Sequence, residues 1–289
     1  MTPRFKTIAL FGRPQSDGID TRILAEIESW LVQRGVTVQT QTSRNTRLIL
    51  SAGRHADLAI IVGGDGTMLG VARTLAPLGV PVVGVNRGRL GFITDIPMSE
   101  WKGALEAILD GHFSIEERAL IEAYAYRQDR LLFHARALND VVISRSSRTG
   151  MIEIEVCVDG LYMYSPRGDG LIVATPTGST AYALSVNGPI MHPSLQGFVL
   201  APVAPQALSN RPIILPDHTE VELTLHHGHQ SRLNCDMQSF SDLQEGDRVI
   251  LRRSADASRF LHPPGYSYYA TLRSKLNWHE IPGLEPRRG

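Results

Sequence analysis

A glycine-rich segment with a single acidic residue offers the clearest chemistry in the sequence. Gly63-Gly64-Asp65-Gly66-Thr67 follows the apolar run 58–62 and precedes a stretch with helical spacing. Glycines at such a junction let backbone N–H groups approach a phosphate beside the positive end of a helix. A carboxylate there is reasonable if it accepts the proton of a hydroxyl that attacks a phosphoryl group. We predict that Gly63, Gly64, Gly66 and Thr67 bind phosphate and that Asp65 is the catalytic base. The alternative is a tight turn in which Asp65 caps the helix.

Two other polar segments have the composition of nucleotide-binding loops. In residues 169–182 a strand runs into the small hydroxyl residues of Thr-Pro-Thr-Gly-Ser-Thr, and residues 183–186 can be helical. These donors suit a nucleoside or a phosphate, and Tyr182 could stack on a base, although a capping turn rich in Ser and Thr has the same composition. Asn139-Asp140 suits two sugar hydroxyls, but such a pair is more often a turn or a cap.

The spacing of these glycines argues against the common nucleotide motifs. A P-loop is excluded because none of the three lysines, Lys6, Lys102 and Lys275, follows a glycine. Gly64-x-Gly66-x-x-x-Gly70 is one residue too long for a dinucleotide fingerprint, which argues against a plain dehydrogenase.

Three further features carry less weight. We predict a hairpin turn rather than zinc at His226-His227-Gly228-His229, because further ligands at suitable spacing are lacking, and hence no protein metal site. Cys235 has no nearby His to activate it and is expected to be buried. The arginines of residues 144–148 could steer phosphates toward Asn139-Asp140.

The elements that position these residues fall into two classes. Strands expected at 7–11, 36–40, 58–62 and 80–85 alternate with helices expected at 23–31, 67–75 and 101–109. This alternation predicts an α/β N-terminal domain with a Rossmann-like parallel sheet, at residues 1–118. From residue 119 to 264, short alternating runs such as 152–158, 161–165, 221–225 and 248–251 predict an antiparallel β-rich domain, with Asp159-Gly160 as a hairpin turn. The tail, about 265–289, has a helical stretch at 270–276 and too little apolar surface to stand alone, so we expect it to dock on the first domain.

Composition limits the cellular role. The 289 residues include 29 Lys plus Arg and 29 Asp plus Glu, so the net charge is zero, which argues against nucleic acid as the main partner. The sequence contains no run long enough for a membrane helix and no signal peptide, so we expect no membrane partner. The two cysteines fit a reducing compartment, and we expect the protein to be cytoplasmic.

Taken together, the motifs resemble those of the NAD kinases. The resemblance covers nearly the whole chain and includes, besides the three segments above, Asn86-Arg87-Gly88-Arg89-Leu90-Gly91-Phe92, Cys235-Asp236-Met237-Gln238 and Tyr266-Ser267-Tyr268-Tyr269. Gly-Gly-Asp-Gly alone is shared with related diacylglycerol kinases, sphingosine kinases and phosphofructokinases. The Asn-Asp pair and Thr-Pro-Thr-Gly-Ser narrow the resemblance to NAD kinases.

The resemblance implies transfer of the γ-phosphoryl group of ATP to the 2′-hydroxyl of the adenosine ribose of NAD, which gives NADP. It implies that Asp65 accepts the hydroxyl proton and that NAD binds in a crevice between the domains. The residues that it implies for NAD binding are Gly66, Phe92, Asn139, Asp140, Arg167, Asp169, Thr177, Thr180, Ala181, Tyr182, Ser185 and, more weakly, Gln238. Gly150 stands where some relatives have a side chain that contacts the dinucleotide.

Several alternatives stay open at this point. Mg²⁺ is expected to arrive with the nucleotide, the donor is ATP or inorganic polyphosphate, and the acceptor is NAD or NADH. The resemblance also implies a homodimer or homotetramer. The competing functions are a non-catalytic NAD-binding sensor, in which an acid at position 65 has no purpose, and a lipid or sugar kinase that shares Gly-Gly-Asp-Gly.

Overall fold

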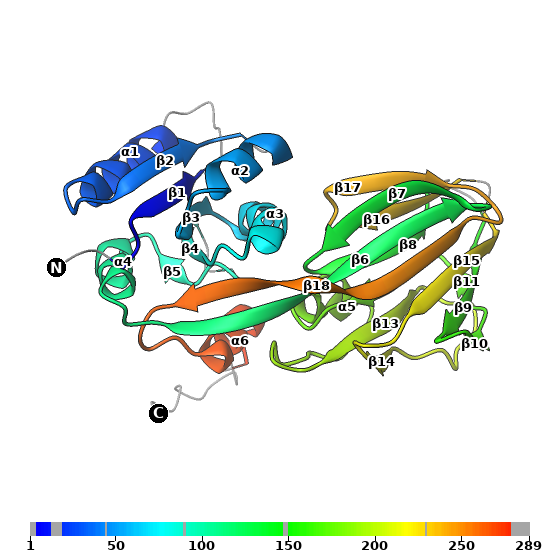
Figure 1. The fold of residues 1–289 in the computed structure, drawn as a ribbon. Coiled ribbons are helices and arrows are strands. Elements are labelled where there is room, and N and C mark those ends of the chain that lie inside the picture. The colour runs from blue at the N-terminus through cyan, green and yellow to red at the C-terminus, as the bar shows by residue number, and fades with distance from the viewer. Residues whose placement is uncertain are drawn as a thin grey trace. The chain divides into compact units, whose positions relative to one another are not determined.

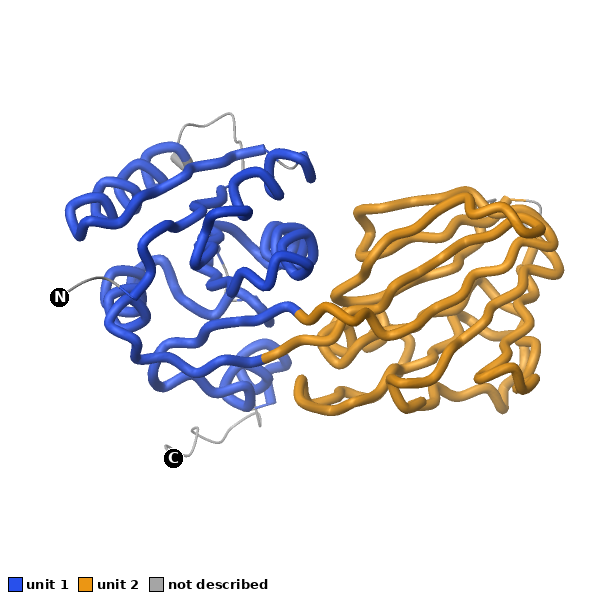
Figure 2. The backbone as a smooth tube through the Cα atoms, viewed as in Figure 1, with its two compact units in different colours: residues 1–116, 258–289 blue, residues 117–257 orange. Residues whose placement is uncertain are grey.

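The chain forms two compact units in the computed structural model, which describes residues 4–12, 19–43, 45–88, 91–146, 150–228 and 230–278. Unit 1 comprises residues 1–116 and 258–289, and unit 2 comprises residues 117–257 (Figure 2). The chain passes from one unit to the other along two long strands, β6 (Ser114–Arg127) and β18 (Arg248–His262). The sequence analysis placed the domain boundaries at 118/119 and 264/265, and the boundaries of the units are at 116/117 within β6 and 257/258 within β18.

Unit 1 is built on the parallel sheet that the sequence predicted. Its strands lie in the order β2-β1-β3-β4, with β5 beside β4, and every pairing is parallel. The last part of β18 adds a parallel pairing with β4, where Phe260 is opposite Val82. The strands are β1 (Thr7–Phe11), β2 (Thr37–Gln41), β3 (Leu58–Gly63), β4 (Val82–Asn86) and β5 (Ile96–Pro97).

Helices pack against this sheet (Figure 1). They are α1 (Ile19–Val32), α2 (Thr46–Gly53), α3 (Asp65–Leu75), α4 (Trp101–Leu109) and α6 (Tyr268–Leu276). Apolar side chains of α1 and α4 share a buried cluster with alternate residues of β1, β3 and β4. On α2, Gly53 lets Leu75 of α3 approach closely, since a Cβ at Gly53 would lie 2.3 Å from a methyl of Leu75. All six residues of β3 are buried, as expected for a central strand of a parallel sheet.

A buried ion cluster ties the end of β18 to the segment that follows β4. His262 is 3% exposed, and its Nδ1 lies 2.7 Å from Oδ2 of Asp95, while its Nε2 lies 3.7 Å from Oε1 of Glu116. Its ring stacks on Tyr266, with 3.7 Å between the ring centroids. Burial lowers the pKa of His262, but the two carboxylates outweigh burial and raise this pKa above its ordinary value. The tail helix α6 belongs to the same unit, and Nζ of its Lys275 lies 5.5 Å from the centre of the Phe92 ring.

Unit 2 consists of two antiparallel sheets. In the first, β9 pairs with β10, β11 and β15, β15 pairs with β18, and β6 pairs with β18 and β7. The second has the order β14-β13-β12-β8-β16-β17. The strands not yet given are β7 (Arg130–Ala137), β8 (Asp140–Arg145), β9 (Ile152–Val158), β10 (Leu161–Tyr164), β11 (Arg167–Gly168), β12 (Gly170–Ala174), β13 (Gly197–Val203), β14 (Ile213–Pro216), β15 (Val221–His227), β16 (Ser231–Cys235) and β17 (Ser239–Leu243).

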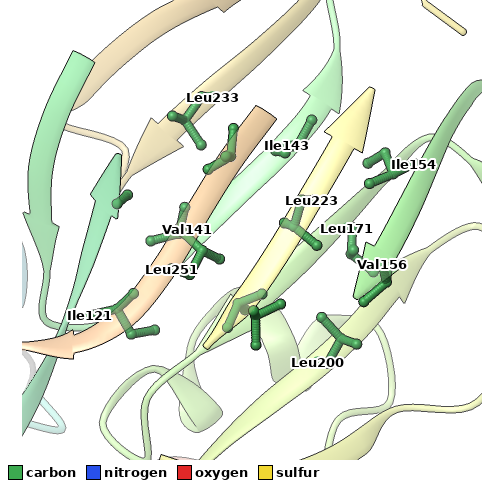
Figure 3. Close-up of a cluster of buried hydrophobic side chains, with 14 of the residues drawn as sticks. Ile121, Val141, Ile143, Ile154, Val156, Leu171, Leu200, Leu223, Leu233 and Leu251 are labelled. Carbon is green, nitrogen blue, oxygen red and sulfur yellow. The ribbon is translucent and has the colours of Figure 1, made fainter. Parts of the chain in front are cut away.

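The core of unit 2 lies between the two sheets. Alternate residues of both sheets form one buried cluster, in which Val141, Ile143, Leu171, Leu200 and Leu233 of the second sheet face side chains of the first (Figure 3). Cys235 is part of this cluster and fully buried, as predicted. The antiparallel β-rich fold is therefore confirmed. The predicted turn at Asp159-Gly160 is also confirmed, since both residues have positive φ between β9 and β10, as a type I′ turn requires.

The prediction of a hairpin at residues 226–229 is wrong. β15, which ends at His227, pairs with β9 and β18 in the first sheet, whereas β16 pairs with β8 and β17 in the second. The connection therefore crosses between the sheets, and Leu225 of the first sheet and Leu233 of the second both enter the shared core. His229 lies outside the described residues.

Among the described helices, none combines the length and the apolar character needed to cross a membrane.

Candidate active site

The glycine loop, residues 63–67, joins a buried strand to a helix as expected. β3 ends at Gly63, Gly64 is the N-cap, and α3 begins at Asp65. A Cβ at Gly64 or Gly66 would meet no atom of the described residues within 4 Å, so packing does not require glycine at either position. Both residues are exposed, which leaves their backbone accessible to a ligand at the start of the helix.

The Asp65 carboxylate contacts the segment that follows β4 rather than capping its own helix. Oδ2 accepts a hydrogen bond from the backbone N–H of Phe92 at 2.8 Å. Oδ1 accepts hydrogen bonds from the Thr94 hydroxyl at 2.8 Å and from the Ile93 N–H at 3.3 Å. The capping alternative is therefore wrong, and the side chain is held in a fixed orientation beside the glycine loop.

The segment that holds Asp65 is itself closely packed. A Cβ at Gly91 would lie 1.8 Å from Oδ1 of Asp65, so only glycine fits there. Asn86, at the end of β4, donates from Nδ2 to the Thr94 hydroxyl oxygen at 2.7 Å and accepts the Gly88 N–H at Oδ1, also at 2.7 Å. Arg89 and Leu90 of the same motif lie outside the described residues.

A pocket of about 450 Å³ lies entirely within unit 2. It is lined by Asn139, Asp140, Val142, Ser144, Ala181, Tyr182, Asn234, Asp236 and Met237. The structure thus brings Asn139-Asp140 together with the end of the 169–182 segment, as expected if both contact one ligand. Asn234 is 5% exposed, and its Oδ1 has no hydrogen-bond partner among the described residues, so the pocket contains a buried acceptor for a ligand N–H or O–H group.

Two carboxylates, those of Asp140 and Asp236, line this pocket. Oδ1 of Asp236 accepts the backbone N–H groups of Asn139 at 2.8 Å and Asp140 at 3.2 Å, and Oδ2 accepts that of Leu138 at 2.9 Å. Asp140 is buried, and burial together with the nearby Asp236 charge raises the pKa of Asp140 to about 7, although a hydrogen bond from the Tyr182 N–H opposes the rise. The protonation state of Asp140 therefore changes near neutral pH.

The Thr-Pro-Thr-Gly-Ser-Thr segment is fixed by hydrogen bonds to the Asn139 region. The Thr175 hydroxyl donates to the Leu138 carbonyl at 2.5 Å, and the Thr175 N–H donates to the Asn139 carbonyl at 2.9 Å. A Cβ at Gly178 would lie 2.0 Å from the Asn139 carbonyl oxygen, so this glycine permits the close approach. The segment then forms a 3₁₀ turn (Gly178–Thr180) and the short helix α5 (Tyr182–Ser185), which places the half-exposed Tyr182 side chain at the pocket.

The other residues of the predicted set do not line this pocket. Oγ1 of the buried Thr177 accepts a hydrogen bond from Arg118 at 3.3 Å, and the Thr180 hydroxyl donates to the Thr177 carbonyl. Ser185 is exposed on α5, and Gln238 is exposed in the turn between β16 and β17.

Two charged residues of the predicted set form ion pairs within unit 2. Arg167 lies 3.4 Å from Glu153, and Asp169 lies 2.6 Å from Arg145, the arginine expected to steer phosphates. Gly150 has a φ of +86°, a conformation that disfavours a side chain. Arg148 lies outside the described residues.

Sequence reasoning missed four residues of these two sites. Thr94 and Asn234 were not singled out as site residues, and Asp236 and Met237 were quoted only as part of a family motif. Asp236 and the backbone that it binds are 96 to 98 positions apart, so no local pattern signals the contact.

Comparison with known proteins identifies the family. Residues 37–113 match the ATP-NAD kinase N-terminal domain, and residues 138–262 match the ATP-NAD kinase C-terminal domain. The chain is 50% identical to the NAD kinase of Bordetella avium, with 96% of this chain and 97% of that one covered. It is 49% identical to the NAD kinase of Paraburkholderia phytofirmans, with 99% and 98% covered.

Solved structures share the fold. Yeast NADH kinase, in a complex with NADH, matches with a TM-score of 0.86 at 19% identity, covering 100% of this chain and 91% of that one. An NAD kinase from Archaeoglobus fulgidus, in a complex with ATP, matches with a TM-score of 0.74 at 25% identity, covering 94% and 98%. The chain belongs to the NAD kinase family.

Proposed function

We propose that the protein transfers the γ-phosphoryl group of ATP to the 2′-hydroxyl of the adenosine ribose of NAD, with Asp65 as the proton acceptor. The observation that carries the assignment of Asp65 is the placement of its carboxylate. It lies in the first turn of α3 beside two exposed glycines, and three hydrogen bonds hold it. A fixed carboxylate next to a phosphate-binding backbone suits the deprotonation of an attacking hydroxyl.

The chemistry assigned to this chain has two parts. The exposed glycines of the loop, Gly64 and Gly66, present their backbone to the phosphates of ATP at the start of α3. Gly63 is buried at the end of β3, and the Thr67 N–H donates to the Gly64 carbonyl at 3.0 Å, so these two residues shape the loop. As the ribose oxygen attacks the γ-phosphorus, its proton passes to Asp65 and the bond to the ADP oxygen breaks. The reaction is in-line phosphoryl transfer and requires no covalent enzyme intermediate. ATP as the donor is supported by the ATP complex of the Archaeoglobus fulgidus relative.

We expect a divalent ion to reach this site bound to the phosphates of ATP. The described residues contain no group of three His, Cys, Asp or Glu side chains that could form a protein cage for a metal. Mg²⁺ is bound in many kinases largely by substrate phosphates and water, so a dedicated protein cage is not required. When bound, Mg²⁺ offsets the negative charge of the phosphates.

The dinucleotide is assigned to the pocket of unit 2. Carboxylates and amides of Asn139, Asp140 and Asn234 suit the amino and hydroxyl groups of an adenosine or a nicotinamide ribose, and Tyr182 offers an aromatic face. We assign the other family positions, which include Phe92, Thr177, Thr180, Ala181 and Ser185, to the remainder of the dinucleotide. Arg167, Asp169 and Gln238 are assigned to contacts at the nicotinamide half or the neighbouring subunit of a homodimer or homotetramer.

A coupled assay tests the proposal. Native protein is incubated with ATP, Mg²⁺ and NAD, and NADP is detected with an NADP-specific dehydrogenase. We expect NADP from the native protein and at least about a 100-fold loss of kcat for Asp65→Asn, since a positioned base typically contributes that much. The Kd for NAD, measured by calorimetry, should stay within about threefold. A loss of NAD affinity as large as the loss of rate would make Asp65 a binding residue instead.

The same assay separates the remaining alternatives. Polyphosphate in place of ATP, or NADH in place of NAD, shows whether the donor or the acceptor differs. NAD binding without NADP under any of these conditions would favour a non-catalytic sensor, and phosphorylation of diacylglycerol or a hexose phosphate would favour another kinase of the superfamily. Both described cysteines are free thiols, which supports our assignment to the cytoplasm.

A further inference from the structure

The hydrogen bonds to Asp65 are unequal at its two carboxylate oxygens. A carboxylate oxygen accepts about two hydrogen bonds. Oδ1 already accepts two, from the Thr94 hydroxyl at 2.8 Å and the Ile93 N–H at 3.3 Å. Oδ2 accepts only the Phe92 N–H at 2.8 Å among the described residues. A substrate hydroxyl therefore has an acceptor position at Oδ2 and none at Oδ1.

The direction of the bond from Thr94 is set by its other neighbour. The Gly88 N–H donates to Oδ1 of Asn86 at 2.7 Å, so the amide group of Asn86 cannot be turned over without two donors facing each other. Nδ2 of Asn86 then donates to the Thr94 hydroxyl oxygen at 2.7 Å. Because a hydroxyl has one proton, Thr94 must donate that proton to Asp65. The chain of bonds from Gly88 through Asn86 and Thr94 to Asp65 therefore runs in one direction.

Packing keeps Thr94 in this position. It is fully buried, and Asn86 is 2% exposed. A Cβ at Gly84 of β4 would lie 3.0 Å from the Thr94 methyl and 3.1 Å from its Cα, so Thr94 is in close contact with the strand backbone. The Thr94 side chain, which orients Asp65, is thus held by close packing against strand β4 of the parallel sheet.

We propose that Thr94, oriented by Asn86, is a positioning residue that makes Oδ2 of Asp65 the oxygen that takes the substrate proton. The inference rests on the proposed role of Asp65. A threonine hydroxyl that donates to Oδ1 fixes the rotation of the carboxylate and leaves Oδ2 to face the reacting hydroxyl.

Three substitutions of Thr94 test the hydroxyl separately from the packing. Thr94→Val keeps the shape without the hydroxyl, Thr94→Ala removes the hydroxyl and leaves space, and Thr94→Ser keeps the hydroxyl. We expect Val and Ala to lower kcat about 10- to 100-fold, as the loss of a hydrogen bond to a charged group predicts, with the KM for NAD within about threefold. Thr94→Ser should keep kcat within about threefold of the native value.

Thr74→Val is the matched control. Thr74 lies near the other end of α3, and its hydroxyl donates to the Gly70 carbonyl at 2.7 Å. The control makes the same chemical change, threonine to valine, in the helix that begins at Asp65, and kcat should not change. Thermal unfolding of every variant shows whether it is folded at the assay temperature.

The proposal is overturned if Ser loses as much kcat as Val and Ala, since the methyl group and not the hydroxyl would then matter. It is also overturned if Val and Ala keep the native kcat, or if KM rises as much as kcat falls. Asp65→Asn in the same assay separates this failure from that of the proposed function. An inactive Asp65→Asn beside a fully active Thr94→Ala refutes the positioning role alone, whereas an active Asp65→Asn refutes the role of Asp65 itself.

Discussion

The buried Asp140 carboxylate should destabilise the folded protein above neutral pH. Burial and the Asp236 charge raise its pKa from an ordinary value of 3.8 to about 7. Between these two values the unfolded chain has released the proton and the folded chain keeps it. Because the folded state binds more protons, the free energy of unfolding falls as pH rises through this range. At about 1.4 kcal/mol per pH unit, the loss reaches about 4 kcal/mol above pH 7.

Asp140→Asn removes this ionisation while keeping an acceptor for the Tyr182 N–H. We expect the variant to gain stability relative to the native protein as pH rises, by about 4 kcal/mol between about pH 4 and pH 8. The measurement is urea unfolding of both proteins at the two pH values, where titrating groups that do not interact with Asp140 cancel in the difference. The same variant should bind NAD less tightly, because the proposed pocket loses a carboxylate.

Asp129→Asn is the control, because the Asp129 side chain is fully exposed. Its effect should stay within about 0.5 kcal/mol at either pH. A difference between Asp140→Asn and the native protein that is the same at both pH values would refute the reasoning, since the Asp140 carboxylate would then titrate alike in the folded and unfolded chains.

Two further substitutions test unit 1. His262→Gln should reduce the loss of stability that the native protein shows as pH rises on the alkaline side. Because the pKa of His262 is raised in the folded protein, its ion pairs contribute fully below pH 6.5 and are lost as pH rises through the higher folded pKa. Thermal unfolding of both proteins at several pH values measures this difference. An unchanged pH dependence would contradict this. Gly91→Ala should lower kcat at least about 100-fold, since displacing a catalytic group by about 1 Å has that effect and the new Cβ would lie 1.8 Å from Asp65. Gly103→Ala, on α4 with nothing within 4 Å of the added Cβ, should keep kcat and gain about 0.5–1 kcal/mol. Equal kcat values for the two alanine variants would show that Gly91 has no steric role.

Local sequence patterns predicted the elements whose residues share one environment along their whole length. The fully buried β3 appears as a continuous apolar run, and the Asp159-Gly160 turn has the residues that positive φ demands. The helix α2 was missed although Asn45 caps it, with its side chain accepting the Arg47 N–H at 2.9 Å. A capping residue before Leu48, Ile49 and Ala52 was the signal that could have found it.

The long strands could not be read in the same way. β6 and β18 are 14 and 15 residues long, and their burial pattern changes along the strand because each belongs to two units. Only the segment 248–251 of β18 was predicted. Period-2 alternation identifies a strand that keeps one face against one core, and neither of these strands does so.

The two sites were found through motifs, whereas the contacts that orient them depend on the tertiary fold. Asp65 was identified by its place among glycines, but Thr94 lies 29 positions away and becomes its neighbour only because β3 and β4 are adjacent in the sheet. Asp236 likewise reaches Asn139 and Asp140 because β16 pairs with β8. Spacing along the chain carries no information about either contact.

The discontinuity of unit 1 has a consequence for the synthesis of the protein on the ribosome. Residues 258–278 supply the strand end that pairs with β4 and the histidine that binds Asp95, yet they are translated after all of unit 2. Unit 2 is continuous, so all of its residues are available once residue 257 has left the exit tunnel. The sheet that holds Asp65 is completed only by the last part of the chain. A chain that ends before residue 258 therefore lacks part of the catalytic unit.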